Sequence, residues 1–353
     1  MTAALNRYKA DLRELRFVLL EQFPFADLTS HERYKAWGAE EAKAMLEATY
    51  RFCQDVLGPT NTVGDREGAK LVDGKVVTPK GFKEAWRGVA ENGFHSVSLK
   101  PEHGGQGSPL MLFVLIEEML SGANVAFNIY PGLARGAAEL IIECGTEAQR
   151  KKYAEKMLNG TWGGTMCLTE PHAGSDVGSA KTRAVKLPDG RYKLSGNKIF
   201  ISGGDHDMAE NIIHLVLARV DGAPAGTKGL SLFIVPKLAL EDGKPNDVHV
   251  TGVEHKMGIN GSATCALSFG DNGECVGELV GTAENVGMSQ MFRMMNGARI
   301  AVGLQSLSVA SSAYQNALDY AKDRRQGANF KFWKDPSKPR VPIIEHPDVR
   351  RML

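Results

Sequence analysis

The sequence predicts an α+β protein of several domains: a helical N-terminal domain, a middle antiparallel β domain shaped like a barrel, and the start of a C-terminal helical bundle. Three observations predict this class. Apolar residues recur at helical spacing over residues 46–161. Alternation with period two replaces that spacing over residues 162–284, and helical spacing returns over residues 285–353. A helical extension over residues 1–45 precedes these parts, and a chain of 353 residues is long enough for several cores.

Composition and charge argue against several classes of partner. Lysine plus arginine number 42 against 41 acidic residues, so no basic field favours nucleic acid. No uninterrupted apolar run approaches the roughly 20 residues of a membrane span, and charges interrupt the first 25 residues. We therefore expect neither membrane insertion nor a secretory leader. Five cysteines without CxxC spacing argue against disulfides and a metal site, and favour a cytoplasmic location.

Short motifs predict where helices of the first part begin. Thr29–Glu32 has the pattern of a capping box, and Thr146–Gln149 repeats it. Thr78-Pro79 predicts a helix start, because proline fits the first helical position after a capping residue. Ser108-Pro109 predicts the same for an apolar helix at Leu110–Leu120.

The middle part predicts a sheet. Val185–Leu187 and Tyr192–Leu194 flank a Pro-Asp-Gly turn, which is a hairpin signal. Further strands are expected at Ile212–Val220, Leu230–Val235, Val248–Val253 and Thr264–Phe269. Because no helices separate these strands, an antiparallel sheet or barrel is favoured over a parallel sheet.

The last part predicts one long helix, or two in line, because apolar residues form a broad face from Val286 to Arg325. A loop containing prolines follows it. His346-Pro347 then predicts the start of another helix, which the chain enters just before Leu353.

Two segments carry residue types suited to a planar heterocycle. Cys167–Val177 predicts a tight polar loop after a strand, in which backbone N–H groups and the Thr169 hydroxyl can face a ring. In Gly196–Gly204, Phe200 and Ser202 stand two positions apart and so are expected on one face of a strand. Taken alone, the first segment also fits an ordinary surface turn, and Phe200 also fits a barrel core.

Together these segments resemble the acyl-CoA dehydrogenase family. The matching motifs are TEPHAGSDVGS (169–179), GNKIFISGG (196–204), Asn296–Arg299 and Tyr320–Arg324. The order of helices, strands and helices matches as well. Residues 8–15, 324–327 and 341–353 resemble the larger bacterial members, a group that includes the 3-methylmercaptopropionyl-CoA dehydrogenases and whose members are longer than this chain.

The resemblance implies FAD bound between the β domain and the last helical domain. The residues implied as cofactor contacts are Cys167, Leu168, Thr169, Phe200, Ser202 and Arg324. The first three would bond the flavin ring through backbone and hydroxyl groups. Phe200 would stack near the ring where many relatives have tryptophan, and Ser202 would hydrogen-bond flavin N5 where relatives usually have threonine. Arg324 would pair with the FAD diphosphate of a neighbouring subunit.

Two further residues receive roles from the resemblance. Ser175 would contact the CoA part of the substrate, and Arg299 would be a buried structural arginine near the site. The implied reaction is α,β-dehydrogenation of a saturated acyl-CoA to the trans-2-enoyl-CoA, with electrons passed to an electron-transfer flavoprotein. The implied setting is fatty acid β-oxidation by a homodimer or homotetramer. An acyl-CoA oxidase, a flavin monooxygenase and a non-catalytic acyl-CoA or flavin binding protein remain alternatives on this fold.

No catalytic base is predicted within the chain. The family's usual base is a glutamate that would lie beyond Leu353, and the other position that some relatives use is occupied by Ala298. Glu170 belongs to the flavin loop, while Glu117 and Glu118 stand on a predicted helix and are interpreted as structural. The sequence therefore predicts a fragment of a longer enzyme that is inactive by itself.

Overall fold

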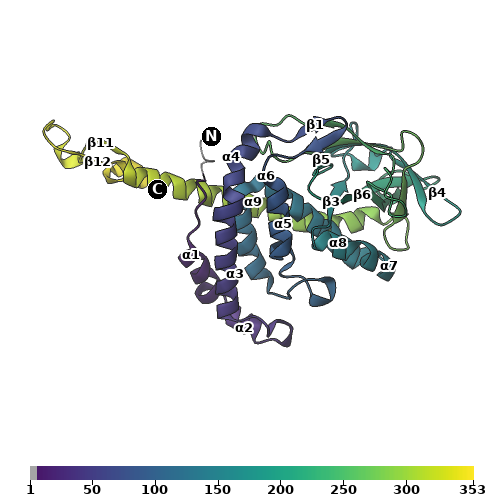
Figure 1. The fold of residues 1–353 in the computed structure, drawn as a ribbon, viewed down its shortest axis with the longest axis horizontal. Helices are drawn as coiled ribbons and strands as arrows, with labels where there is room; N and C mark the ends of the chain where they lie inside the picture. Colours follow the sequence, from purple (N-terminus) through teal and green to yellow (C-terminus); the bar gives the residue numbers. More distant parts are fainter. Residues whose placement is uncertain (1–5) are drawn as a thin grey trace.

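The computed structural model describes residues 6–353 and confirms the predicted fold class. Figure 1 shows a helical part, a β part beside it, and a long helix that runs past both and ends in a projecting hairpin. The helices before the sheet are α1 (Leu12–Phe17), α2 (Phe25–Thr29), α3 (Ala39–Phe52), α4 (Gly58–Glu67), α5 (Phe82–Glu91), α6 (Leu110–Cys144), α7 (Glu147–Gln149) and α8 (Glu155–Leu158).

Two of the predicted helix starts are wrong. Thr29 ends α2, and its hydroxyl donates back to the Ala26 carbonyl, a local bond that competes with starting a helix. The next long helix, α3, begins at Ala39, where Glu41 accepts the Gly38 N–H at 3.0 Å. Thr78 caps no helix either, because its hydroxyl donates to the carboxylate of Asp207. The N-cap residue of α5 is Gly81.

The other two starts are confirmed. The Thr146 hydroxyl accepts the Gln149 N–H at 3.2 Å, and the Gln149 side chain accepts the Thr146 N–H at 3.1 Å, which completes a capping box. Leu110 begins α6 as predicted, although Pro109 rather than Ser108 is the N-cap residue and no side chain caps this start. The helix continues to Cys144, well beyond the predicted apolar segment.

Helix α6 is the core helix of the N-terminal part. It bends at Asn124, whose side chain accepts the Phe127 N–H at 3.0 Å and donates to Thr60 at 2.8 Å. By length and composition it could cross a membrane, contrary to the sequence analysis. In this fold, however, more than half of its most apolar window is buried, and the buried Arg135 donates to the His95 carbonyl at 2.7 Å. Its apolar surface is therefore used in packing between helices.

The β part is a single mixed sheet. Its strands are β3 (Trp162–Cys167), β4 (Arg183–Lys186), β5 (Tyr192–Ser202), β6 (Asn211–Val220), β7 (Leu230–Pro236), β8 (Val248–Val253), β9 (Thr264–Phe269) and β10 (Val276–Leu279). Their order is β10-β7-β6-β4-β5-β9-β8, with β3 beside β6 and an additional β10–β5 pairing. The predicted hairpin, β4–β5, is confirmed. Most of the pairings are antiparallel, as predicted, but β6 pairs in parallel with both β3 and β4.

The sequence analysis missed a hairpin between α4 and α5. Strands β1 (Lys70–Val72) and β2 (Lys75–Val77) pair antiparallel around Asp73-Gly74. Both turn residues have positive φ, 49° and 73°. Asp-Gly between short apolar runs is a strong hairpin signal, so this element could have been predicted.

Helix α9 (Gly287–Asp323) confirms the predicted long helix and lies antiparallel to α6. Gly136 of α6 lies close to Met294, and Gly122 lies close to Ser308. Beyond α9, strands β11 (Arg325–Ala328) and β12 (Arg340–Pro342) form a ribbon where a plain loop was expected, and α10 (Pro347–Met352) begins as predicted. Figure 1 shows this end projecting from the body.

Candidate functional site

The two segments singled out in the sequence lie side by side. The Ile199 N–H of β5 donates to the Thr169 carbonyl at 2.9 Å, just after β3 ends. The Lys198 ammonium donates to the Leu168 carbonyl at 3.1 Å. The end of β3 is therefore fixed against the second half of β5, and Thr169 and Phe200 are brought into one region.

A buried ion pair fastens this junction. Lys198 is fully buried, Glu170 is 2% exposed, and their charged atoms lie 2.8 Å apart. Glu170 also accepts bonds from the N–H groups of Lys181 at 2.7 Å and Thr182 at 3.0 Å, and from the Thr182 hydroxyl at 2.6 Å. Burial alone would raise the pKa of Glu170, but the Lys198 charge and these bonds together hold it well below its usual range. Glu170 is thus a satisfied structural carboxylate and is not placed to act as a base.

Phe200 is the most unusual residue of the site. Strand β5 shifts register against β9 between Lys198 and Ile201, and Phe200 has φ 60° within this bulge. Its side chain is 57% exposed, so the alternative that it fills a barrel core is wrong. A bulky residue at positive φ with an exposed ring is a strained conformation of the kind found at ligand sites.

Cys167 lies behind the site and is fully buried. The Thr165 hydroxyl is hydrogen-bonded to His214 Nδ1 at 2.8 Å and lies 3.3 Å from Cys167 Sγ. Burial lowers the pKa of His214 to about 3, so this imidazole stays neutral. Cys167 could therefore contact a ligand through its backbone but not through its buried side chain. The Thr165–His214 pair was missed, because the parallel β3–β6 pairing that joins them was not predicted.

Ser175 lies in an exposed loop beside the site. The chain turns sharply at Glu170–Ala173, whose end residues exchange N–H···O bonds of 3.0 and 3.1 Å. Gly174 follows, and a Cβ placed there would contact only the Thr169 methyl group at 3.7 Å. The loop therefore leaves open space beside Thr169.

The two predicted arginines are both exposed. Arg299 donates to Asn296 at 3.0 Å and stacks over Phe292, so the expectation of a buried arginine is wrong. This face of α9 has few neighbours among the residues that the structure describes, and only a few α9 residues are buried. Arg324 ends α9 and donates to Gln326 at 3.1 Å, which leaves most of its guanidinium open to solvent.

Two carboxylates of α6 have pKa values raised by burial. Glu117 of α6 accepts a bond from Asn128 at 2.9 Å, and burial raises its pKa. Glu118 stands next to it on α6, where burial also raises its pKa. Across residues 6–353, no cluster of three His, Cys, Asp or Glu side chains is arranged to hold a metal ion.

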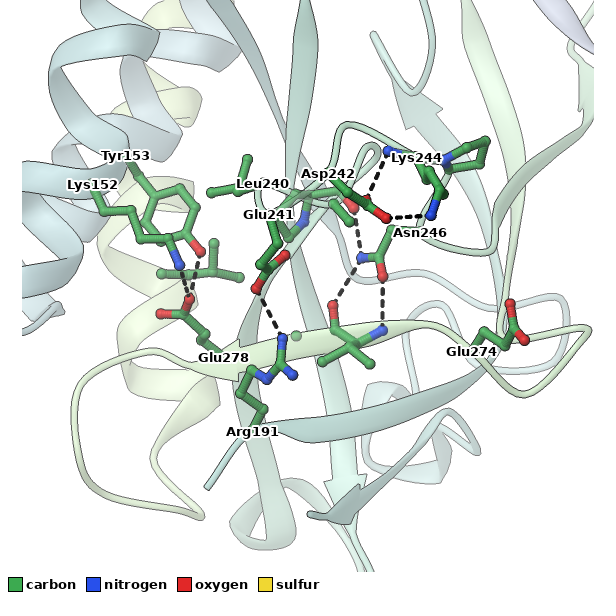
Figure 2. Close-up of a pocket in the computed structure, with 16 residues that line it drawn as sticks. Lys152, Tyr153, Arg191, Leu240, Glu241, Asp242, Lys244, Asn246, Glu274 and Glu278 are labelled. Carbon is green, nitrogen blue, oxygen red and sulfur yellow. Dashed lines mark hydrogen bonds and ion pairs between the residues drawn. The ribbon is translucent and has the colours of Figure 1, made fainter. Parts of the chain in front are cut away.

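A separate hollow of about 260 Å³ lies between η6 (Arg150–Ala154) and the sheet, and Figure 2 shows its lining. None of its lining residues belongs to the two segments described above. Its cations are already paired: Lys152 with Glu278 at 2.6 Å, and Arg191 with Glu241 at 3.0 Å. Lys244 likewise pairs with an acidic neighbour, so the described lining of this hollow offers no unpaired cation to a ligand.

Comparison with known proteins identifies the class that this fold and site define. Residues 39–161 match the model of the acyl-CoA dehydrogenase N-terminal domain, and residues 165–272 match that of the middle domain. The chain belongs to the acyl-CoA dehydrogenase family, which confirms the predicted family. It is 42% identical over 350 residues to the 3-methylmercaptopropionyl-CoA dehydrogenase of Ruegeria pomeroyi. That match covers 98% of this chain and 58% of the relative, so the chain spans little more than half of that protein's length.

Solved structures show the same fold. Butyryl-CoA dehydrogenase from Megasphaera elsdenii matches 88% of this chain and 73% of its own, with a TM-score of 0.70 at 28% identity. An acyl-CoA dehydrogenase complexed with FAD from Bacillus anthracis matches 90% of this chain and 48% of its own, with a TM-score of 0.70 at 26% identity.

Proposed function

We propose that this chain is the flavin- and acyl-CoA-binding part of an FAD-dependent acyl-CoA dehydrogenase. The reaction would convert a saturated acyl-CoA thioester to the trans-2-enoyl-CoA. One observation carries the proposal: Phe200 exposes an aromatic ring at positive φ, beside the backbone of Leu168 and Thr169. A strained aromatic next to a fixed backbone edge and open space fits one side of a planar ring.

FAD, when bound, would supply the hydride-accepting ring. The Cys167–Thr169 backbone and the Thr169 hydroxyl would bind its edge, Phe200 would lie near its plane, and the Ser202 hydroxyl would hydrogen-bond N5. These roles follow the family motifs at the same positions. The Glu170–Lys198 pair would hold these groups in place rather than take part in proton transfer.

The remaining groups complete the proposal. Ser175 would contact the CoA part of the substrate, and Arg324 would pair with the FAD diphosphate of a neighbouring subunit, which suits its exposed position. Arg299 would support the site from α9. The base would be a glutamate beyond Leu353, because Glu170 is fully engaged and Glu117 lies within the N-terminal helices.

We further propose a cytoplasmic homodimer or homotetramer that works in fatty acid β-oxidation and passes electrons to an electron-transfer flavoprotein. The division into residues 1–45, 46–161, 162–284 and 285–353 is part of the same proposal. Similarity to the Ruegeria pomeroyi relative makes 3-methylmercaptopropionyl-CoA one substrate to test beside unbranched acyl-CoAs.

The test is anaerobic addition of saturated acyl-CoAs to two proteins, one ending at Leu353 and one translated to the natural stop codon. We expect the longer protein to hold FAD and its visible flavin band to bleach. The acyl-CoA that bleaches it fastest names the substrate. Rapid reoxidation by oxygen would instead favour an oxidase or a monooxygenase. Failure of both proteins to bleach with any acyl-CoA would overturn the dehydrogenase proposal and leave a binding role.

A further inference from the structure

Ser202 is the last residue of β5, and a sharp turn follows it directly. Gly203 has φ 63° and donates to the Ala263 carbonyl at 2.7 Å. A Cβ on Gly204 would lie 2.7 Å from the Cys265 Cβ, so only glycine fits there. Any shift of the residues that follow this turn would therefore be transmitted to Ser202.

The chain after the turn reaches into the N-terminal helical part through two carboxylates. Asp205 is 1% exposed and accepts the Val76 N–H of β2 at 2.9 Å, while Lys237 pairs with its other oxygen. Figure 1 shows the β1 strand lying beside the sheet, and contacts between β1 and β8 agree with that placement. The hairpin that the sequence analysis missed is thus a contact between the two parts.

Asp207 makes the second connection. It accepts the Thr78 N–H at 3.1 Å and the Thr78 hydroxyl at 2.6 Å, and it pairs with Lys83 of α5 at 2.8 Å. Burial would raise the pKa of Asp207, but Lys83 and Thr78 together lower it, so the carboxylate is charged. Charged acceptors form the stronger class of hydrogen bond.

His206 stands between the two aspartates in the sequence, and its ring packs against the N-terminal helices. Its ring centroid lies 5.4 Å from that of Trp86 in α5 and 5.3 Å from that of Tyr130 in α6. Burial lowers the pKa of His206 to about 4, so it packs as a neutral ring. The Tyr130 hydroxyl accepts the Ala263 N–H at 2.7 Å, which ties α6 to the residue just before β9, where Thr264 pairs with Ser202.

We propose that Asp205 and Asp207, held by the backbone of Val76 and Thr78 and by Lys83, form a latch whose function is to position Ser202 for the flavin. This inference rests on the proposed function. It gives a positioning role to residues of the N-terminal part: Val76 and Thr78 each stand 129 positions before the aspartate to which they donate. Neither Asp205 nor Asp207 touches the reacting atoms, and each acts through the glycine turn.

The test uses the full-length protein with two substitutions at one position and a matched control. Asp207→Ala removes both the charge and the bonds to Thr78. Asp207→Asn keeps an oxygen that can accept them. Asp221→Ala removes a surface carboxylate of the same sheet that binds Arg183 at 2.8 to 3.0 Å, and it serves as the control.

Three quantities are measured for each protein: the FAD dissociation constant from flavin fluorescence quenching, the limiting rate of anaerobic flavin reduction, and backbone amide exchange of residues 203–208 without FAD. We expect Asp207→Ala to raise the dissociation constant about tenfold, equivalent to about 1.4 kcal/mol. The limiting reduction rate should also fall, while the half-saturating acyl-CoA concentration is unchanged and amide exchange is faster. The Asp207→Asn variant should have values close to those of the wild type in all three quantities, and Asp221→Ala should match the wild type.

The outcomes separate this inference from the proposed function. A wild type that binds FAD and is reduced, together with an Asp207→Ala variant equal to it in all three quantities, overturns the latch alone. An Asp207→Ala variant that only lowers the unfolding midpoint, with FAD affinity and reduction rate unchanged, also overturns it. A wild type that binds no FAD overturns both proposals.

Discussion

Replacing Lys198 by methionine tests what holds the segments Cys167–Val177 and Gly196–Gly204 together. The substitution keeps most of the side-chain volume and removes the charge. It leaves the Glu170 carboxylate buried without its counter-ion and the Leu168 carbonyl without its donor. Breaking a buried ion pair by removing one partner costs about 3–5 kcal/mol.

The contacts of Glu170 set where in that range the cost should fall. Three hydrogen bonds, two from N–H groups and one from the Thr182 hydroxyl, remain in the variant. They keep the carboxylate partly satisfied, so we expect a loss near the lower end, about 3 kcal/mol. Adding Glu170→Gln removes the stranded charge, and the double variant should recover about half of that loss.

Urea unfolding at pH 7, followed by circular dichroism, gives these free energies. Lys244→Met serves as the control, because Lys244 is paired but 78% exposed on its side chain, and it should leave the unfolding midpoint unchanged. A Lys198→Met variant within about 1 kcal/mol of the wild type, or a double variant less stable than the single one, would refute the reasoning.

Three further measurements test other parts of the site. Glycine tolerates positive φ, so without FAD the Phe200→Gly variant should be more stable than Phe200→Ala by about 1 kcal/mol. Both variants should bind FAD more weakly than the wild type. A Phe200→Ala variant more stable than Phe200→Gly would contradict the inference that Phe200 is strained. Burial lowers the pKa of His95 and His206 to about 4 and that of His214 to about 3. These histidines therefore bind more protons in the unfolded chain than in the folded one below about pH 6.5, so the urea midpoint should fall as pH drops from 6.5 toward 4. The His214→Gln variant should show a smaller fall of the midpoint over this pH range. An equal fall in the variant and the wild type would count against a buried neutral imidazole at His214. Arg324→Gln should weaken FAD binding in the assembled protein while Arg325→Gln, its exposed neighbour, should not; equal affinities for the two variants would remove the diphosphate role.

Local signals in the sequence predicted elements whose causes are local. The Thr146–Gln149 capping box, the β4–β5 hairpin and the long α9 helix depend on residues a few positions apart, and each is confirmed. The β1–β2 hairpin had an equally local signal in Asp73-Gly74 that was overlooked. The Thr29 error shows the limit of such motifs, because a hydroxyl that can cap a helix start can also bond back to a helix end.

The features that define the site are set by pairings between distant segments. The bulge that turns Phe200 outward exists only because β5 changes register against β9, and no residue near Phe200 announces that shift. The Thr165–His214 contact requires the parallel β3–β6 pairing. Arg299 was expected to be buried from its position in a motif, but burial depends on neighbours, which the motif does not contain.

The site combines one strained residue with two sets of buried polar contacts, and this combination has a physical reason. The backbone of Phe200 at φ 60° is strained, which costs free energy. Because the ring is exposed, its burial does not offset this cost in the absence of a ligand. Such a conformation persists only where its surroundings fix it. Lys198 and Glu170 fix the strand on one side of Phe200, and the glycine turn held by Asp205 and Asp207 fixes the other side. The surface that a ligand would stack on is then preorganised, so binding does not carry the free-energy cost of ordering that surface. On this argument, variants that loosen either set of contacts should weaken FAD binding even though neither set is proposed to contact the flavin.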